Sequence, residues 1–393
     1  MQWPWKKKNL SDVWKWPLAS LVNLFGYWAE EAKTESNRIW KKRFRALTML
    51  FLPYIMMSMV IQGFVKFAEG DIMQNLFTIF AAGPGMVGLG KFLGIVFYRK
   101  QIKSVWDRLS AMISEADNPK LEHIARNSLK RTWILFIVYL SIFTASVTDW
   151  LMRPPAAAIL YHKKARIVDT WPVFLDTWLQ WFLSYLLQFP AIVLLGHSNY
   201  TYEILYFCTS EVILCHFKLL NYKLKHLVLR DNKESTEKLI SCVKYHQNLL
   251  SVCNDFKNST SKVLIWQFLN TVIMLCTGIF ILTVLIKQTP YVAVINLFEV
   301  CTFEIMSLYL YCWYSNEITF QCSDVSNAVY MAEWINAKPS DKKTMLITMS
   351  KAEQPLLFGG ILEIRLETFI NILKTSFSFY NFLLAFQVNS TEK

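Results

Sequence analysis

Seven long apolar blocks, separated by charged links, constrain this chain more than any other feature of its sequence. They lie at about residues 47–65, 73–97, 133–152, from 173, 263–286, 292–313 and 356–386. A helix needs about 20 residues to cross roughly 30 Å of hydrocarbon, and each block reaches that length. The pattern predicts an all-α membrane protein with seven transmembrane helices.

The composition excludes several other classes of protein. Of the 393 residues, 54% are hydrophobic and only 18% are charged, whereas soluble domains have about 25% charged residues. The 12 glycines and 12 prolines are too few for a collagen-like or low-complexity chain. The 8 cysteines have neither CxxC nor Cys/His metal spacing, so we interpret them as small buried hydrophobic residues.

The lysines and arginines predict the direction of the spans. They are abundant before the first block and at 99–131, between the second and third blocks, whereas the link after the first block has only Lys66. Cytosolic links carry the excess of positive residues, so we expect the N-terminus inside and, after seven crossings, the C-terminus outside. This distribution explains the net charge of +12 without a nucleic-acid partner.

One apolar stretch, 173–229, is long enough for one span or two. Counting one span keeps the Lys-rich segment 218–262 in the cytosol, in agreement with the other links. The fourth helix then continues past the bilayer, with an apolar stripe that includes Leu220 and Leu224. Residues 324–349 offer a partner at comparable spacing. We therefore expect a bundle of helices on the cytosolic side.

The resulting plan has five parts. They are a cytosolic N-terminal segment (1–45), six helices (46–322) with an outer loop (153–172), a cytosolic anchor helix (323–355), a seventh helix (356–387) and an extracellular tail (388–393). Pro154-Pro155 begins the outer loop in this plan, and Trp171-Pro172 precedes the fourth helix. We expect this loop to form a folded external lid.

Catalytic and cofactor motifs do not occur in a fitting context. The sequence has no Ser/His/Asp, HExxH, GxGxxG or GxxxxGK[ST] pattern at a suitable place, and its 6 histidines lack metal-ligand spacing. The glycine-rich stretch 83–90 lies within the second block, where close helix packing explains it better than a phosphate loop. We expect no enzyme, no metal and no cofactor.

Ionisable residues inside apolar blocks are costly and often functional. Asp149 and Asp176 lie near outer ends, where water reaches them, while Glu299 and Glu304 lie deeper in the sixth block. These two glutamates either form hydrogen bonds between helices or meet a ligand. Lys374 has polar neighbours on one face of the seventh block, which suits either a water-filled path or hydrogen bonding between helices.

Aromatic residues are concentrated in the outer halves of the second, third, fourth and sixth blocks. Some are interfacial anchors, and we expect the others to line an apolar pocket for a small volatile molecule. Phe143, Ser146 and Trp150 share one helix face, because they are three and four residues apart. The candidate pocket residues are Phe80, Phe143, Ser146, Trp150, Trp181, Tyr185, Phe189, Phe298 and Thr302. Aromatic walls without an obvious charge favour neutral esters, terpenoids or aromatic compounds over amines and acids.

The C-terminal third of the chain resembles the insect odorant receptors. Residues 310–318 (LYCWYSNEI) are similar to the family's pattern of an apolar run, Tyr-Cys, an aromatic and Gly-Asn, with Ser in place of Gly. Ala328, Tyr330 and Trp334 fit its Ala-x-Tyr-x-x-x-Trp element, and residues 372–379 (ILKTSFSF) resemble its Leu-Lys-x-Ser-Tyr-Ser element. The order and spacing of these fragments carry the resemblance.

The resemblance implies a ligand-gated cation channel in the plasma membrane, expected in the sensory dendrites of olfactory neurons. The family's co-receptor has a long insertion before the fifth span, whereas the corresponding link here, about 231–261, is short. The chain therefore resembles an odorant-specific tuning subunit. Such a subunit would sit in membrane lipid, form a heterotetramer with the co-receptor and bind a small neutral volatile odorant.

The resemblance also gives the seventh helix a role. It implies that this helix lines the pore, with Ser378 facing the pore and with Phe382 and Phe386 at a hydrophobic gate. Aligning the family on Gln387 instead would select a different pair of residues for the gate, Leu384 and Val388.

Three other classes stay open as alternatives. Gustatory receptors end in Thr-Tyr, five apolar residues and Gln-Phe, and this chain keeps only the Gln, at Gln387, which favours the odorant family. A metabotropic seven-helix receptor would have its N-terminus outside, opposite to the charge pattern. A transporter is expected to show an inverted repeat or matched broken helices, and neither is visible in the sequence.

Overall fold

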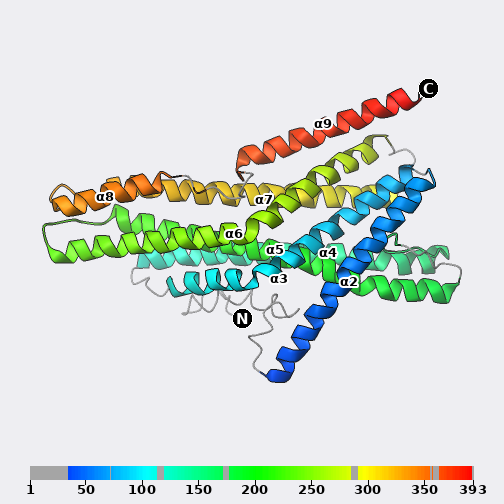
Figure 1. Cartoon of the computed structure of the whole chain (residues 1–393), viewed down its shortest axis with the longest axis horizontal. Coiled ribbons are helices and arrows are strands. Elements are labelled where there is room, and N and C mark those ends of the chain that lie inside the picture. The colour runs from blue at the N-terminus through cyan, green and yellow to red at the C-terminus, as the bar shows by residue number, and fades with distance from the viewer. Residues whose placement is uncertain are drawn as a thin grey trace.

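The computed structural model describes residues 34–70, 72–112, 119–170, 177–284, 291–354, 356 and 363–391. Its described residues form eight helices. Most of them run roughly along the longest axis of the molecule, whereas α2 crosses the others at a steep angle (Figure 1). They are α2 (Glu35–Ala68), α3 (Ile72–Met112), α4 (Pro119–Tyr161), α5 (Trp178–Lys225), α6 (Lys233–Val284), α7 (Tyr291–Tyr330), α8 (Pro339–Ala352) and α9 (Leu366–Thr391). The N-terminal residues 1–33, and with them most of the predicted cytosolic segment, lie outside the described residues.

The all-α class predicted from the apolar blocks is confirmed. In the part of the chain that the structure describes, six helices, α2 to α7, are long and apolar enough to cross a membrane. They contain the described residues of the first six apolar blocks, apart from Thr177, which caps α5. The seventh block corresponds to α9, whose 26 residues would span about 39 Å at 1.5 Å per residue. The sidedness of these helices stays a prediction.

α5 is the long continuous helix that the sequence predicts for the fourth block. Its 48 residues extend about 72 Å, well beyond the thickness of a bilayer. A capping box fixes its start: Gln180 N donates to Thr177 Oγ1 at 3.2 Å, and Thr177 N donates to Gln180 Oε1 at 3.1 Å. Between Tyr200 and Phe217 every residue is buried, so this part of α5 is the centre of the molecule.

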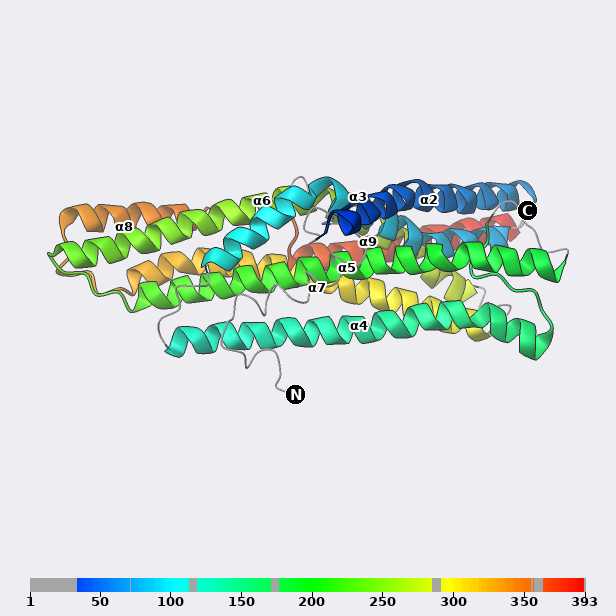
Figure 2. The same cartoon turned by 90° about the horizontal axis from the view of Figure 1, so that it is seen from below.

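The predicted anchor helix, 323–355, is two helices instead of one. α7 continues to Tyr330, a turn follows, and α8 begins at Pro339, which suits the first turn of a helix because it has no N–H to satisfy. The turn is tied to the end of α5, since Leu229 N donates to Glu333 O at 2.8 Å and Glu333 N donates to Leu227 O at 2.9 Å. The expected bundle is present at this end of the molecule, with α8 beside α6 (Figures 1 and 2).

The predicted packing partner of the α5 stripe is also present. Val325, Ala328 and Val329, near the end of α7, are all buried and belong to the same apolar core as Leu220 and Leu224 of α5. Their three- and four-residue spacing places them on one face of α7. The stripe on α5 is therefore covered by α7 rather than by α8.

The outer loop is shorter than predicted, because α4 continues through Pro154-Pro155 to Tyr161. A proline inside a helix leaves the carbonyl four residues earlier without its partner. For Pro155 that carbonyl belongs to Leu151, and it accepts a hydrogen bond from Tyr185 Oη of α5 at 3.1 Å. Packing against α5 thus replaces the missing helical bond, and the chain leaves the helix at His162, which has φ +51°.

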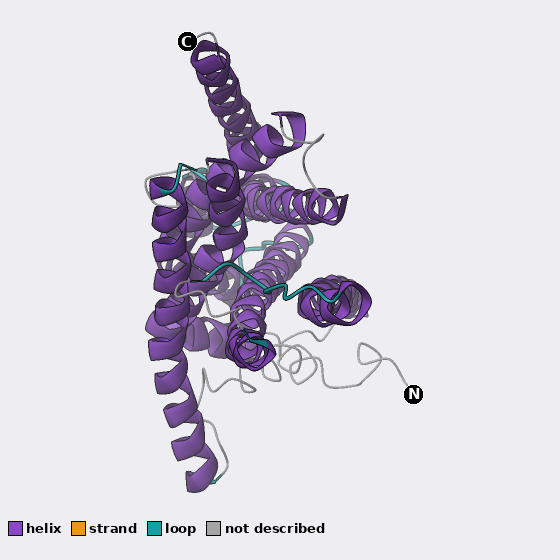
Figure 3. Cartoon of the chain, turned by 90° about the vertical axis from the view of Figure 1, so that its right-hand side faces the viewer, coloured by secondary structure: helices purple, strands orange, loops and turns teal. Residues whose placement is uncertain are grey.

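α9 begins at Leu366 rather than at Leu356, where the seventh block begins. Arg365 N donates to Thr368 Oγ1 at 3.3 Å, a side-chain contact of the kind that starts a helix. α9 packs against α6 and α7, and its C-terminal half stands out from the bundle (Figures 1 and 3). The C-terminal end of α9 lies at the same end of the molecule as the α4–α5 connection (Figure 2).

Candidate functional site

A cavity of about 420 Å³ lies between α3, α4, α5 and α7. Five of the predicted pocket residues line it together. Phe143, Ser146 and Trp150 come from one face of α4, as their spacing predicts, and Phe298 and Thr302 come from one face of α7. The sequence pattern thus identifies two walls of this cavity.

The third wall, on α5, was not predicted. It consists of Gly196, Asn199 and Tyr200, and the Tyr200 ring stacks on Phe143 with ring centroids 5.0 Å apart. Gly196 allows this approach of α4 to α5, because a Cβ there would lie 3.0 Å from Phe143 Cε2. Gly196 and Tyr200 are four residues apart, so the sequence did indicate that they share a helix face. Because α5 is apolar on all its faces, the sequence did not show that this face lines a cavity.

Trp181, Tyr185 and Phe189 lie elsewhere, in an aromatic ladder along the first three turns of α5. The Trp181 and Tyr185 rings stack with centroids 6.0 Å apart, and Phe189 meets Tyr185 edge-on at 6.1 Å. The polar ends of the first two rings bind backbone. Trp181 Nε1 donates to Ala165 O at 2.5 Å, and Tyr185 Oη donates to Leu151 O. These residues hold the outer loop and the end of α4, and they do not line the cavity.

Phe80 also lies outside this cavity. It belongs to a small apolar cluster with Met274, Ile281 and Leu297. It borders a separate hollow of about 520 Å³ between α2, α3 and α6.

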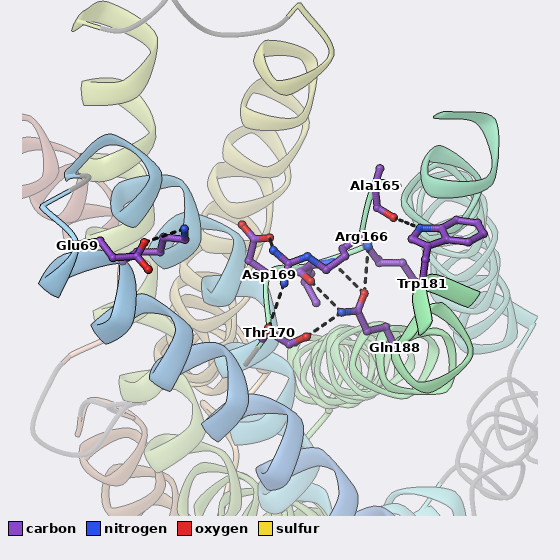
Figure 4. A network of polar contacts seen from close by, with 10 residues as sticks. Glu69, Ala165, Arg166, Asp169, Thr170, Trp181 and Gln188 are labelled. Carbon is purple, nitrogen blue, oxygen red and sulfur yellow. Dashed lines mark hydrogen bonds and ion pairs between the residues drawn. The ribbon is translucent and has the colours of Figure 1, made fainter. Parts of the chain in front are cut away.

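Gln188 holds the outer loop against α5 through both ends of its amide. Its Oε1 accepts hydrogen bonds from the N–H groups of Ile167 and Val168, at 3.1 and 3.4 Å, and its Nε2 donates to Val168 O and Thr170 Oγ1, both at 2.9 Å. Figure 4 shows these contacts beside the ion pair of Arg166 with Asp169, whose atoms are 2.6 Å apart. The described residues 162–170 of the loop are therefore folded against α5 and fastened by Gln188. That the loop forms an external lid stays a prediction.

Two sets of buried charged groups lie in the bundle, and one of them borders the cavity. Glu304, at the cavity wall, accepts hydrogen bonds from Gln267 Nε2 at 2.8 Å and Thr271 Oγ1 at 2.7 Å, so it joins α7 to α6. Lys91 of α3 pairs with Glu203 of α5 at 2.6 Å, and both side chains are at most 1% exposed. Sequence reasoning missed this ion pair, because a single charge in an apolar block hardly changes its average hydropathy.

The predicted pore residues lie on α9. Ser378 and Phe382 are exposed in the single chain, one helical turn apart, and Lys374 is exposed one turn before them. Ser376 is buried and donates to Ile372 O at 2.9 Å, which satisfies its hydroxyl inside the helix. The side chain of Phe386 lies outside the described residues. Among the described residues, no group of three or more His, Cys, Asp or Glu side chains could hold a metal ion.

Comparison with known proteins defines the class to which this fold and cavity belong. The profile of one family, described as 7tm Odorant receptor, matches residues 70–377, more than half of the chain. The chain therefore belongs to the odorant receptor family, as the motifs in its C-terminal third indicate. The family consists of membrane receptors rather than enzymes. Its members bind odorants and work with a co-receptor.

Individual relatives and solved structures agree with this assignment. The chain is 22% identical to odorant receptor 42b of Drosophila melanogaster over 84% of its own length and 81% of that protein's. It is also 22% identical to odorant receptor 59b of the same species, with 85% and 83% covered. The structure of the olfactory receptor OR5 from Machilis hrabei has the same fold, with a TM-score of 0.82, 16% identity, and 96% and 99% of the two chains covered.

Proposed function

We propose that this chain is an odorant-specific subunit of a heteromeric ligand-gated cation channel, assembled with the family's co-receptor. The observation that carries the proposal is the aromatic cavity between α3, α4, α5 and α7, in a chain of the odorant receptor family. Its walls suit a small, neutral, mostly apolar volatile molecule. In support, OR5 of Machilis hrabei, which shares the fold, has been solved in complex with eugenol, with a TM-score of 0.81 and 14% identity to this chain.

The proposal includes a plasma-membrane topology of seven crossings, with a cytosolic N-terminus and an extracellular C-terminus. The arrangement of the helices supports it, since the C-terminal end of α9 shares one end of the molecule with the α4–α5 loop, while α8 lies at the other end (Figures 1 and 2). In this topology α8 and the inner ends of α5, α6 and α7 form the cytosolic anchor. α9 borders the pore, with Ser378 facing it and with Phe382 and Phe386 at the gate.

Ligand binding opens the channel only to the extent that the ligand binds the open state more tightly than the closed state. The cavity is joined to the rest of the bundle at Glu304, whose hydrogen bonds to Gln267 and Thr271 reach α6. α6 in turn packs against α9. A ligand that shifts α7 would therefore act on α9 through α6 as well as directly.

Expression in cells that lack G-protein signalling tests the channel proposal. Currents evoked by volatile compounds are expected when the chain and the co-receptor are expressed together, and not when this chain is expressed alone. A response that requires G proteins, or a C-terminal tag accessible only from the cytosol, would contradict the proposal.

A matched pair of α4 variants tests the site. Ser146→Trp fills the cavity and is expected to abolish ligand-evoked current, because Ser146 lines it. Ala145→Trp places the same ring one residue away, at an exposed position outside the cavity wall, and should leave the current in place. Surface labelling of both variants separates loss of ligand binding from loss of folding. Equal responses from the two variants would show that the ligand does not bind in this cavity.

A further inference from the structure

Three polar side chains at the cavity wall have unused hydrogen-bonding groups. Glu299, Ser146 and Thr302 line the cavity, and none of them forms a hydrogen bond or ion pair with a described residue. Other hydroxyls on α4 are satisfied within the helix: Ser141 and Thr144 donate to carbonyls one turn earlier, at 2.9 and 2.8 Å. The hydroxyls of Ser146 and Thr302 lack such a bond, so they remain available to a molecule in the cavity.

Glu299 is the most informative of the three. It lies about two turns after Tyr291, the first residue of α7, and so within an apolar span. Glu304, further along the same helix, accepts hydrogen bonds from two side chains, whereas no described residue donates a hydrogen bond to Glu299. A carboxyl group in an apolar span is costly unless it is paired, and such groups are commonly functional. A ligand in the cavity would supply the missing donor.

We propose that Glu299 is the hydrogen-bond acceptor for a neutral alcohol or phenol bound in this cavity. The inference rests on the proposed function and specifies the chemical class of the odorant. The ligand hydroxyl donates its hydrogen to the Glu299 carboxylate, and its oxygen accepts a hydrogen bond from Ser146 or Thr302. The aromatic side chains of Phe143 and Trp150 pack against the apolar body of the ligand.

A hydroxyl matches these groups better than an amine or an ester does. A protonated amine can donate to Glu299 and to the oxygens of Ser146 and Thr302, but it offers no acceptor for their hydroxyl hydrogens. Removing its water is also far more costly than removing that of a hydroxyl. An ester has only acceptors, so Glu299 would stay unpaired. A hydroxyl both donates and accepts, so it can serve the Glu299 acceptor and the hydroxyl hydrogen of Ser146 or Thr302 together.

The experiment uses pairs of ligands that differ only at the hydroxyl. The full chain is expressed with the co-receptor, and concentration–response curves are recorded for small aromatic and terpenoid alcohols and for their methyl ethers. At least one alcohol is expected to act at a concentration about tenfold below its ether, the size expected for one hydrogen bond to a charged group. Glu299→Leu should remove that advantage and leave the response to the ether unchanged.

Two further variants make the result specific. Glu299→Gln keeps an acceptor oxygen and is expected to give an intermediate loss for the alcohol. It also carries the comparison if Glu299→Leu does not reach the cell surface. Glu317→Leu makes the same change on α7 outside the cavity, where Glu317 accepts from Gln321 Nε2 at 3.1 Å, and should leave the preference for the alcohol intact.

Three results would overturn the assignment. They are a wild-type chain that responds equally to alcohols and ethers, a Glu299→Leu variant that keeps its preference for the alcohol, and equal losses for both ligands in that variant. A wild-type chain that reaches the surface with the co-receptor but gives no current to any volatile compound would overturn the proposed function itself, and this assignment with it.

Discussion

Two segments of one helix, residues 178–190 and 200–217 of α5, are both rich in apolar and aromatic residues but pack in opposite ways. In the first segment Gln188 is the only buried residue, whereas in the second every residue is buried. The first segment fastens the outer loop, and the second is surrounded by α3, α4, α6 and α7. A helix in a membrane protein is apolar where it meets lipid and where it meets protein, so hydropathy does not distinguish the two environments.

The buried segment differs in its polar groups. It contains Glu203, Glu211 and His216, and each has partners: Lys91 for Glu203, Arg131 and Ser128 for Glu211, and Tyr245 with the carbonyl of Leu109 for His216. A polar side chain that is buried without a partner is strongly destabilising. The paired polar residues, rather than the apolar ones, thus identify the part of α5 that faces protein.

The largest effect is expected from breaking the ion pair between Lys91 and Glu203. Lys91→Met leaves the Glu203 carboxylate buried without its partner, which costs about 3–5 kcal/mol. The melting temperature of the purified protein and its surface expression should both fall sharply. Lys66→Met removes a lysine that pairs with Glu69 at the end of α2, where Glu69 is 53% exposed, and should change little. Similar stability in both variants would show that the buried segment, 200–217, tolerates an unpaired charge.

A phenylalanine pair on α5 compares the two segments directly. Phe207 is fully buried and meets Tyr311 with ring centroids 5.1 Å apart, so Phe207→Ala should cost about 3–4 kcal/mol of unfolding free energy. Phe182, in the segment 178–190, is 48% exposed, and Phe182→Ala should cost less than about 1 kcal/mol. Chemical denaturation in detergent measures both. A cost at Phe182 as large as that at Phe207 would mean that the segment 178–190 is also covered by protein.

Gln188→Ala should loosen the outer loop with a smaller and local effect. The substitution leaves the buried N–H groups of Ile167 and Val168 without their acceptor, at a cost of about 2–3 kcal/mol. Hydrogen exchange at 166–170 is expected to speed up, while exchange at 200–217 stays unchanged. Faster exchange in both segments would show that they unfold together.

At neutral pH the smallest effect is expected from His246 of α6, which makes the stability of the protein depend on pH. The pKa of His246 is lowered from an ordinary value near 6.5 to about 4. Burial is the main cause, and the positive charge of Lys351 adds to it. Between these values the unfolded chain binds the proton and the folded chain does not, so stability is complete above about pH 6.5 and falls as the pH drops towards 4. His246→Phe should flatten that part of the melting curve against pH. An unchanged slope would mean that His246 is protonated in the folded protein.

The sequence predicts the helices well and their contacts less well. Length and apolar content locate α2 to α7, and charge predicts that the fourth block is one long helix. The anchor helix was predicted as one element because an apolar periodicity continues past Tyr330. Pro339 and the backbone bonds of Glu333 break it. The outer loop was predicted to start at Pro154 because a proline usually ends a helix, whereas Tyr185 supplies the bond that Pro155 lacks.

For the cavity, too, the sequence predicts positions along one helix but not the contacts between helices. Spacing alone places Phe143, Ser146 and Trp150 on one wall, because residues three and four apart on a helix share a face. It does not reveal that Tyr200 stacks on Phe143, or that Trp181 turns to Ala165 instead, because these contacts depend on how α5 rotates against α4. The Lys91–Glu203 pair joins residues on different helices, 112 positions apart, and only the folded chain brings them together.

Pro190 stands where the exposed segment of α5 gives way to the buried one. It lacks an N–H, so the helical bond to the carbonyl of Leu186 is not formed and the helix bends more easily at this turn than elsewhere. A movement of the outer loop would therefore be absorbed at this turn. Residues 178–189 would tilt together with their aromatic ladder, while the buried residues 200–217 would stay aligned with the helices around them.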